Sequence, residues 1–312
     1  MTRLWSVGVV VADLIAAPVD TFPPPGGLRF LQRLDWSIGG NAANAAVAYA
    51  RLGGTSECVG RVGVDPEGDL LVDRFEAAGV GTRWLDRDPR RPTATTVVLV
   101  NQVGERSFLH RKGGNGALEP DVLESLPLAD GDWILVAGVP LLERFVGRDF
   151  ARALGQARER GARICIDTVG HPGPEDWEAL RPALPLVDWF VPSEIEAIGL
   201  AGAPDVESAM ETFLAAGAAN VAVKLAGAGC RWASRDGASG ELPAAPVIVA
   251  DTLGAGDAWC AGLIAGLGAG WAPVDALKAA NAVGADSVAH SGPSDGIRPF
   301  EDVARRLANG AS

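Results

Sequence analysis

Apolar runs with the length of strands alternate with longer helix-like segments along most of this chain, and this rhythm constrains the fold most strongly. Such alternation is typical of a mostly parallel sheet with helices on both faces, so we predict a doubly wound α/β fold. The expected strands span residues 4–11, 57–62, 133–137, 162–167, 189–192 and 221–225, and the expected helices include 40–52, 66–78, 254–267 and 273–289.

Two segments interrupt this rhythm with patterns of antiparallel β-structure. Residues 14–38 combine a proline-rich stretch with an alternating run that includes Trp36, and residues 93–112 alternate on both sides of a turn. Alternation around a glycine-containing turn indicates a hairpin. We expect a small β-sheet that projects from the main domain as a lid over a substrate cleft. Its apolar faces need cover from the main domain or from a second subunit, and we expect a homodimer made through the lids. The alternative to a lid is a surface embellishment without a role in the cleft.

Composition narrows the class of protein. With 312 residues, the chain could form one large α/β domain or two ordinary ones, and we interpret residues 1–312 as a single domain. A net charge of −12 argues against binding to nucleic acid, which needs basic surface. No stretch matches a membrane helix or a signal peptide, so we expect a cytoplasmic protein. The four cysteines and three histidines show no metal-ligand spacing.

The clearest chemical signal is the segment DTLGAGD at residues 251–257, which leads into a helix of small apolar residues. Glycines at a helix start let the backbone approach an anion and expose N–H groups, and the helix dipole adds positive potential. Asp257 then lies in the first turn. A carboxylate there is poorly suited to binding phosphate but well placed to accept a proton from an attacking hydroxyl. The alternative is an ordinary capping aspartate after a glycine turn.

A second signal is the segment GGNAAN at residues 39–44. Asn41 and Asn44 lie three positions apart at the start of a predicted helix, so their amides share one face and can converge. Amides donate and accept hydrogen bonds, which suits vicinal hydroxyls. The alternative is an asparagine cap on a tightly packed helix.

These two segments, in this order and separation, resemble the two signatures of the ribokinase-like (PfkB-type) carbohydrate kinase family. Other stretches that resemble the family are 60–68 (its VGxDxxG stretch), 105–108 and 113–115 (its lid segment) and 223–229 (its nucleotide-proximal loop). The resemblance extends from about residue 4 to about residue 305. It implies a ribokinase-like fold and an ATP-dependent kinase that phosphorylates a hydroxyl of a sugar.

The resemblance also implies roles for single residues. Asp257 is implied as the base, and the backbone amides of Gly254, Ala255 and Gly256 as the anion hole for the transferring phosphoryl group. The residues implied to bind the substrate are Asp13, Gly39, Gly40, Asn41, Asn44, Asn115 and Lys112.

ATP and Mg²⁺ are the implied cofactors. The residues implied to lie along the nucleotide are Lys224, Gly227, Gly229, Asn281, Ser193 and Glu196, with Glu196 holding Mg²⁺ through water. Asp251 and the turn at residues 291–292 are implied to lie near a monovalent-cation site that many members have, for which K⁺ is the candidate.

The sequence departs from the family pattern in two places. Ser193 stands where many members carry the asparagine of an N-x-x-E motif, and a hydroxyl can bind water there but with less reach. The segment DTVG at residues 167–170 lacks the asparagine of a D-x-N pattern, which leaves Asp167 as the candidate. Neither change removes the base or the anion hole, so we expect an active enzyme.

The substrate is less constrained than the chemistry. Asn41 stands where some relatives carry lysine, and residues 39–44 hold no cation to meet a substrate phosphate, which favours an unphosphorylated sugar. Arg111 and Lys112 beside the lid keep a phosphosugar open, and an adenosine-like nucleoside is the nearest enzyme alternative. A catalytically silent binding or structural relative is disfavoured by the intact 254–257 segment. A dinucleotide-binding oxidoreductase is disfavoured because no G-x-G-x-x-G follows the first strand.

Overall fold

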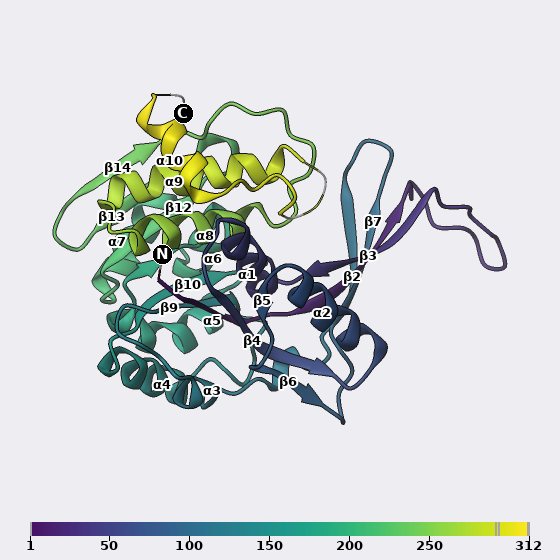
Figure 1. Cartoon of the computed structure of the whole chain (residues 1–312), viewed down its shortest axis with the longest axis horizontal. Helices are drawn as coiled ribbons and strands as arrows, with labels where there is room; N and C mark the ends of the chain where they lie inside the picture. The colour runs from purple at the N-terminus through teal and green to yellow at the C-terminus, as the bar shows by residue number, and fades with distance from the viewer. Residues whose placement is uncertain (1, 291, 293, 311–312) are drawn as a thin grey trace.

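The computed structural model describes residues 2–290, 292 and 294–310, and within them the larger sheet has ten strands (Figure 1). Its strand order is β14-β13-β12-β11-β10-β9-β1-β4-β5, with β6 paired to β4. The strands are β1 Leu4–Gly8, β4 Ser56–Gly63, β5 Val80–Gly81, β6 Leu85–Asp88, β9 Trp133–Val139, β10 Arg163–Thr168, β11 Trp189–Phe190, β12 Asn220–Lys224, β13 Cys230–Ser234 and β14 Ser239–Leu242. The predicted fold class is confirmed.

The sheet is parallel from β5 to β12, and the β13–β14 hairpin extends it in antiparallel pairing. Strand β1 lies between β9 and β4, so the chain winds away from β1 in both directions. In open α/β sheets, ligands bind at the carboxyl ends of the strands where the strand order reverses. The topology therefore points to the end of β1 and the neighbouring strand ends as the place for a site.

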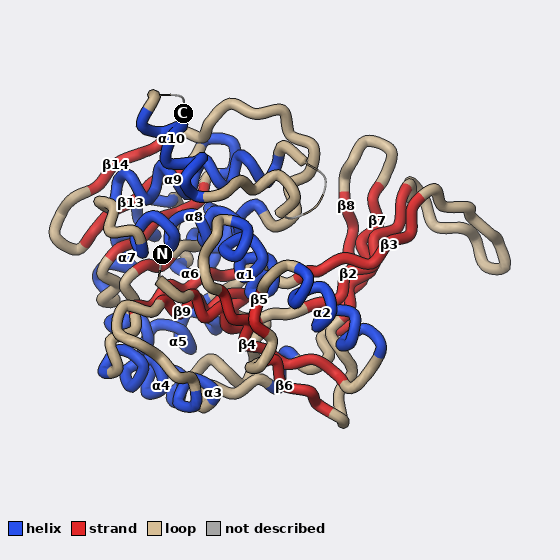
Figure 2. The backbone as a smooth tube through the Cα atoms, viewed as in Figure 1, coloured by secondary structure: helices blue, strands red, loops and turns tan. Residues whose placement is uncertain are grey.

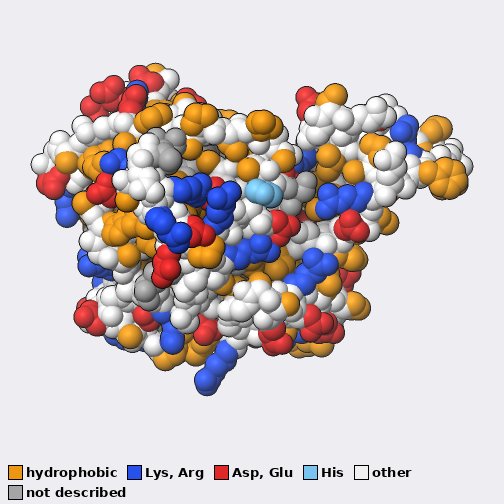
Figure 3. Space-filling model, turned by 45° about the horizontal axis from the view of Figure 1, so that its top comes forward, with side chains coloured by type: hydrophobic (Ala, Val, Ile, Leu, Met, Phe, Trp, Pro, Cys, Tyr) orange, Lys and Arg blue, Asp and Glu red, His pale blue; other side chains and the backbone are white. Residues whose placement is uncertain are grey.

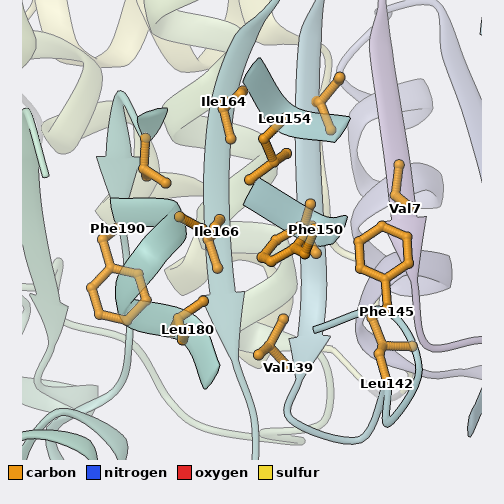
Figure 4. Packing of buried hydrophobic residues seen from close by; sticks show 14 of the residues in the cluster. Val7, Val139, Leu142, Phe145, Phe150, Leu154, Ile164, Ile166, Leu180 and Phe190 are labelled. Atoms are coloured by element: carbon orange, nitrogen blue, oxygen red, sulfur yellow. The ribbon is translucent and has the colours of Figure 1, made fainter. Parts of the chain in front are cut away.

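Side chains alternate between the two faces of the sheet, and each face has its own apolar core. Ile134 and Val136 of β9 belong to one core, whereas Trp133 and Leu135 belong to the other. Figure 4 shows part of the first core, in which side chains of the sheet and of the helices that cover it interdigitate. Helices on both faces give the sheet the full cover that a buried parallel sheet needs.

The helices are α1 Asn41–Arg51, α2 Pro66–Ala77, α3 Val122–Ser125, α4 Arg148–Glu159, α5 Pro174–Leu180, α6 Glu194–Ala201, α7 Val206–Ala215, α8 Ala255–Gly268, α9 Pro273–Val288 and α10 Phe300–Ala308, with 3₁₀ turns η1 Asn115–Ala117, η2 Arg181–Leu186 and η3 Ala226–Ala228. No helix among the described residues is both long and apolar enough to cross a membrane.

Helix α8 approaches its neighbour α9 closely because glycines line the contact. A Cβ atom on Gly262 would lie 2.9 Å from the Cβ of Val283, and one on Gly266 would lie 2.8 Å from the Cα of Ala276. Such separations leave no room for a side chain. The small residues of α8 therefore fix the position of the whole helix, including its first turn.

A second, four-stranded sheet projects from the body of the molecule (Figures 1 and 2). Its strand order is β3-β2-β7-β8, with bounds β2 Val11–Ala17, β3 Arg33–Gly39, β7 Thr95–Val100 and β8 Arg106–Arg111. Strands β7 and β8 form the predicted antiparallel hairpin. The small additional sheet is thus confirmed, and it begins three residues before the predicted start at residue 14.

The prediction of one strand over residues 4–11 was wrong, because the chain leaves the main sheet after Gly8 and enters the second sheet at Val11. A Cβ atom on Gly8 would lie 2.1 Å from the carbonyl oxygen of Ala137, so β1 and β9 are too close for a side chain there. The amide of Asn115 binds both the N–H and the C=O of Val10, at 3.1 and 3.0 Å. These bonds hold the crossing between the two sheets.

The first core predicts a large stability cost when an aromatic ring is removed. Phe213 is fully buried, and its ring centroid lies 4.8 Å from that of Phe190. We expect Phe213→Ala to lower the free energy of unfolding by about 3–5 kcal/mol, because it leaves a cavity. Ile248 is 91 % exposed, so Ile248→Ala should change that free energy by about 0.5 kcal/mol or less. Denaturant titrations followed by circular dichroism measure the free energy of unfolding of both variants. Equal losses of this free energy in the two variants would contradict the burial of Phe213 in the core.

Candidate active site

Two helices begin beside the end of β1, and glycines make both starts possible. Gly40 precedes α1 with φ 91°, and Gly254 precedes α8 with φ 73°. Residues other than glycine rarely adopt these angles. A Cβ atom on Gly40 would also lie 2.4 Å from the carbonyl oxygen of Val9. The two segments singled out in the sequence therefore start neighbouring helices at the strand ends where the topology predicts a site.

The carboxylate of Asp257 is held by two amides from α1. Nδ2 of Asn41 donates to Oδ1 at 2.9 Å, and Nδ2 of Asn44 donates to Oδ2 at 2.9 Å. Asp257 is 5 % exposed. Burial raises its pKa to about 6, although the bonds from Asn44 and Asn41 and the charge of Lys224 act to lower it. The carboxylate is therefore ionised near neutral pH, yet its pKa is close enough to that range to accept a proton.

A cavity of about 370 Å³ opens beside Asn44. Trp36 and Ser37 of the second sheet line it together with Asn44 and Val47 of α1. Oδ1 of Asn44 is buried and has no hydrogen-bond partner within the described part of the chain. An unsatisfied buried carbonyl oxygen is costly, so this atom is well suited to accept a bond from a ligand hydroxyl.

Lys224 and Asp167 form a buried ion pair behind the first turn of α8. Nζ of Lys224 lies 2.6 Å from Oδ1 of Asp167, and their side chains are 12 % and 1 % exposed. Burial alone would lower the pKa of Lys224, but the Asp167 carboxylate raises it well above its usual value. Nζ also lies 3.3 Å from the point where a Cβ on Gly256 would stand. A positive charge therefore abuts the glycine-bearing turn.

Glu196 is buried at the start of α6. Its Oε2 accepts from the backbone N–H of Ser193 at 2.8 Å and from Oγ1 of Thr168 at 2.9 Å. Ser193 is the N-cap residue of α6, and Glu196 supplies the carboxylate half of a capping box by accepting from its backbone N–H. Both bonds fall on one oxygen, so Oε1 is the oxygen left for a further ligand.

Asp251 joins the second sheet to the loop that precedes α8. Nη2 of Arg106 lies 2.6 Å from Oδ1 of Asp251, and Nη1 donates to Oγ1 of Thr252 at 3.0 Å. Asp251 also accepts from the backbone N–H of Leu253 at 2.7 Å and from that of Gly292 at 3.3 Å. Its negative charge is therefore already balanced by a guanidinium. Residue 291, which belongs to the predicted cation site, lies outside the described residues.

Asp13 and the glycines of the 39–44 segment lie together at the base of the second sheet. Asp13 is 5 % exposed, and burial raises its pKa to about 6. A Cβ atom on Gly39 would lie 2.0 Å from Oδ2 of Asp13, so only glycine fits opposite this carboxylate. The structure thus places Asp13 beside the turn that starts α1.

Other predicted site residues have different partners. Lys112 is exposed and pairs with Glu143. Asn115 binds the backbone of Val10, as described above. Oδ1 of Asn281 accepts from Nε1 of Trp259 at 2.8 Å, and its Nδ2 donates to the carbonyl oxygens of residues 242 and 243 at 3.1 and 3.0 Å. The structure does not bring these three side chains to the Asp257 carboxylate, and their ligand-binding roles stay predictions.

The two glycines of the nucleotide-proximal loop differ in the space around them. A Cβ atom on Gly227 would meet nothing within 4 Å, whereas one on Gly229, with φ 98°, would lie 2.1 Å from the carbonyl oxygen of Leu242. Gly229 is therefore required by the fold. Gly227 leaves free space beside the loop, and its role stays a prediction.

Two residues have a place in the site that sequence reasoning did not give them. Arg106 was quoted within a lid motif and Thr168 within the DTVG segment, both without a role. Asp167 was the candidate of that segment, but its partner was not predicted. The position of Asp167 and Lys224 at the ends of predicted parallel strands was the available signal, because such ends meet at one edge of a sheet. No local signal exists for Arg106, which lies 145 residues from Asp251.

Comparison with known proteins identifies the family of the chain. Residues 1–299 match the pfkB family carbohydrate kinase. The chain is 32 % identical over 274 residues to a fructokinase of Klebsiella pneumoniae, covering 86 % of this chain and 85 % of that one.

Solved structures show the same fold. Arabidopsis thaliana ribokinase, complexed with ribose and ATP, superposes with a TM-score of 0.82 at 21 % identity over 98 % of each chain. Fructokinase of Vibrio cholerae O395, in a form with fructose, ADP and calcium ion bound, gives a TM-score of 0.77 at 27 % identity over 98 % of each chain. The chain belongs to the PfkB family and is a carbohydrate kinase.

Proposed function

We propose that this kinase transfers the γ-phosphate of ATP to a hydroxyl of an unphosphorylated sugar, with Asp257 as the general base. The observation that carries the proposal is the buried Asp257 carboxylate in the first turn of α8, with one amide on each oxygen. The two amides orient the carboxylate, and its pKa of about 6 keeps it ionised at neutral pH. It can therefore accept the hydroxyl proton as the oxygen attacks phosphorus.

The start of α8 supplies the anion hole in this proposal. The first amides of a helix have no intrahelical partners, so those of Gly254, Ala255 and Gly256 are candidates to donate to the phosphoryl oxygens. The amide of Ala255 already lies 3.4 Å from the carbonyl oxygen of Thr252, a long contact. Gly254 and Gly256 are therefore the stronger candidates.

ATP and Mg²⁺ fit the remaining donor groups. Lys224, Gly227, Gly229, Asn281 and Ser193 are the residues that we propose along the nucleotide. Glu196 can hold a water on Mg²⁺ through Oε1, because its bonds to the described residues both fall on Oε2. The metal ion, when bound, neutralises charge on the phosphate oxygens.

The substrate side of the site consists of small and amide groups. We propose that Asp13, Gly39, Gly40, Asn41 and Asn44 bind the sugar hydroxyls. The Oδ1 of Asn44, which has no partner among the described residues, supports this assignment. Because the similar protein of Klebsiella pneumoniae is a fructokinase, fructose is the first sugar to test. Lys112 and Asn115 stay lower-ranked candidates, since both have partners within the protein.

We propose that the second sheet acts as the lid of a single kinase domain. Arg106 ties it to Asp251 and Thr252, next to the turn that begins α8. A lid held there would exclude water from the reacting groups. The resemblance implies a K⁺ site near Asp251. The guanidinium of Arg106 already supplies a positive charge to this carboxylate, so a bound K⁺ would add to that charge and would not replace it.

Exposed apolar side chains on the lid support a homodimer. Figure 3 shows hydrophobic side chains on the projecting part of the molecule. Those that are more than half exposed are Phe22, Leu28, Phe30, Leu34, Val103, Phe108 and Leu109. Strands β3 and β8 are the edges of this sheet. A second copy of the chain that covers this surface would remove both the apolar patch and the open edges.

Replacement of the base tests the function directly. We expect wild-type protein with MgATP to release ADP with one class of compound in a panel of sugars, sugar acids, phosphosugars and nucleosides. Asp257→Asn should lower kcat by about 10³-fold, because it removes the proton acceptor. Asp275→Asn changes an exposed aspartate that pairs with Lys278 and should retain full activity. Turnover that survives in Asp257→Asn would exclude this residue as the base, and turnover with nucleosides alone would replace the sugar in the proposal.

The contact between the lid and the loop predicts a specific kinetic defect. We expect Arg106→Gln to lower kcat/KM for the sugar about tenfold, because it removes a charge-assisted bond that holds the lid. Arg29→Gln is the matched control, since Arg29 bonds only Thr21 within the lid among the described residues. Steady-state kinetics of the two variants test this expectation. An unchanged kcat/KM in Arg106→Gln would contradict a role of this contact in closing the lid.

The lid surface predicts the oligomeric state. Sedimentation velocity of the wild type should give a dimer of the 32.2 kDa chain. Phe30→Asp should shift the protein toward monomer, because a charge cannot be buried in an apolar interface without cost. Val274→Asp, on α9 of the main body, should leave the dimer intact. A monomeric wild type would reject the proposed dimer.

A further inference from the structure

The ion pair of Lys224 with Asp167 has a position that a purely structural role does not explain. A buried ion pair often contributes little net stability, since removing two charges from water offsets their attraction. The pair nevertheless lies within a cluster of buried ionisable groups at the end of the sheet. That cluster consists of Asp167 of β10, Glu196 of α6, Lys224 of β12, and Asp257 and Cys260 of α8.

The ammonium group of Lys224 lies beside the helical turn that carries the base. Nζ of Lys224 lies 3.3 Å from the position of a Cβ on Gly256, the residue before Asp257, and 4.0 Å from Sγ of Cys260. Asp167 holds the ammonium group at 2.6 Å. The charge is therefore fixed at one side of the first turn of α8, while the amides of α1 hold the carboxylate.

We propose that Lys224 and Asp167 are a pair of positioning residues that set the protonation state of Asp257, with Lys224 favouring the ionised carboxylate and Asp167 opposing it. The proposal rests on the proposed function of Asp257 as the base. An ammonium next to a buried carboxylate stabilises its charged form, and a second carboxylate destabilises it. Asp167 also keeps the lysine in place, so the two effects come from one fixed geometry.

The groups that face Asp257 from each neighbouring element are consistent with this assignment. Helix α1 contributes the neutral amides of Asn41 and Asn44. Lys224 lowers the pKa of Asp257, and Glu196 raises it. Burial raises the pKa of Asp167, the ammonium of Lys224 at 2.6 Å lowers it, and the charges of Glu196 and Asp257 raise it further. Because such coupling is mutual, the ionised Asp167 also raises the pKa of Asp257.

The thiol of Cys260, on the same helix as the base, stays neutral. Burial raises its pKa well above the usual value. Lys224 is therefore the cation of the cluster within the part of the chain that the structure describes.

The two partners have opposite expected effects on the pH profile. Turnover needs the ionised base, so kcat/KM falls as the pH drops through the pKa of Asp257, about 6. Lys224→Met removes the stabilising charge, so the acid limb should move to higher pH. Asp167→Asn keeps an oxygen that accepts from Nζ but removes the negative charge, so the limb should move to lower pH.

The experiment measures kcat/KM for the sugar against pH in the wild type, both single variants and the double variant. We expect shifts of about one pH unit in opposite directions for the single variants. The double variant should lie between them. Asp286→Asn is the matched control, because it changes a partly buried aspartate that pairs with Arg306 in α10. Its acid limb should stay at the wild-type position.

A second readout does not depend on turnover. Aspartate carboxylates labelled with ¹³C are titrated by NMR without ligands, and the Asp257 signal is identified by its loss in Asp257→Asn. A midpoint that moves as predicted while the kinetic limb stays fixed would leave the ion-pair proposal intact and reject Asp257 as the base.

The proposal is overturned if both single variants move the NMR midpoint in the same direction, or if neither moves it. Lys224→Met leaves Asp167 buried without its partner, and circular dichroism checks whether it folds. If Lys224→Met does not fold, the test rests on Asp167→Asn alone, because asparagine has nearly the same shape as aspartate. A midpoint that stays fixed or rises in Asp167→Asn would then overturn the proposal.

Discussion

The bonds from two asparagine amides of α1 to the Asp257 carboxylate of α8 are the interaction on which the site depends. They join residues that lie 216 and 213 positions apart in the sequence. Both helices must start at the same strand end for the bonds to form, which requires the left-handed glycines Gly40 and Gly254. Alanines of α1 and α8, among them Ala42 and Ala258, belong to one buried cluster and let the two helices lie close together. Close packing of the two helices is therefore necessary for the chemistry. Larger side chains between them would move the amides of Asn41 and Asn44 away from Asp257.

The groups around the site provide positive potential, although the molecule as a whole is negatively charged. The chain has a net charge of −12, yet its proposed task is to hold a polyanion. The first turn of α8 contributes backbone N–H groups, and Lys224 adds a fixed positive charge beside it. Arg106 brings a further cation from the second sheet to Asp251. Because buried charges and oriented amides are screened less than surface charges, these few groups outweigh the acidic surface at the point of reaction.

The sequence predicted those parts of the fold whose signal is local. Buried strands such as β9 and β10, the glycine turn before α8 and the β7–β8 hairpin of the second sheet each have a pattern confined to a short segment. The break after Gly8 was missed because the apolar run continues through it. For Asn115 and Asn281, the residue type allowed a ligand-binding role, but their partners are backbone groups that only the folded chain brings near. The partner of Arg106 could not be predicted for the same reason.

The central claim is that Asp257 accepts the proton of the sugar hydroxyl that attacks ATP. A crystal structure with the sugar, ADP and a planar mimic of the transferring phosphoryl group tests it most directly. The account predicts one sugar hydroxyl at about 2.6–3.2 Å from a carboxylate oxygen of Asp257, facing the mimic on the opposite side from ADP. It also predicts that the mimic's oxygens lie against the amides of the turn at Gly254. A reacting hydroxyl that contacts a different acceptor, with Asp257 still bound only to Asn41 and Asn44, would contradict the account.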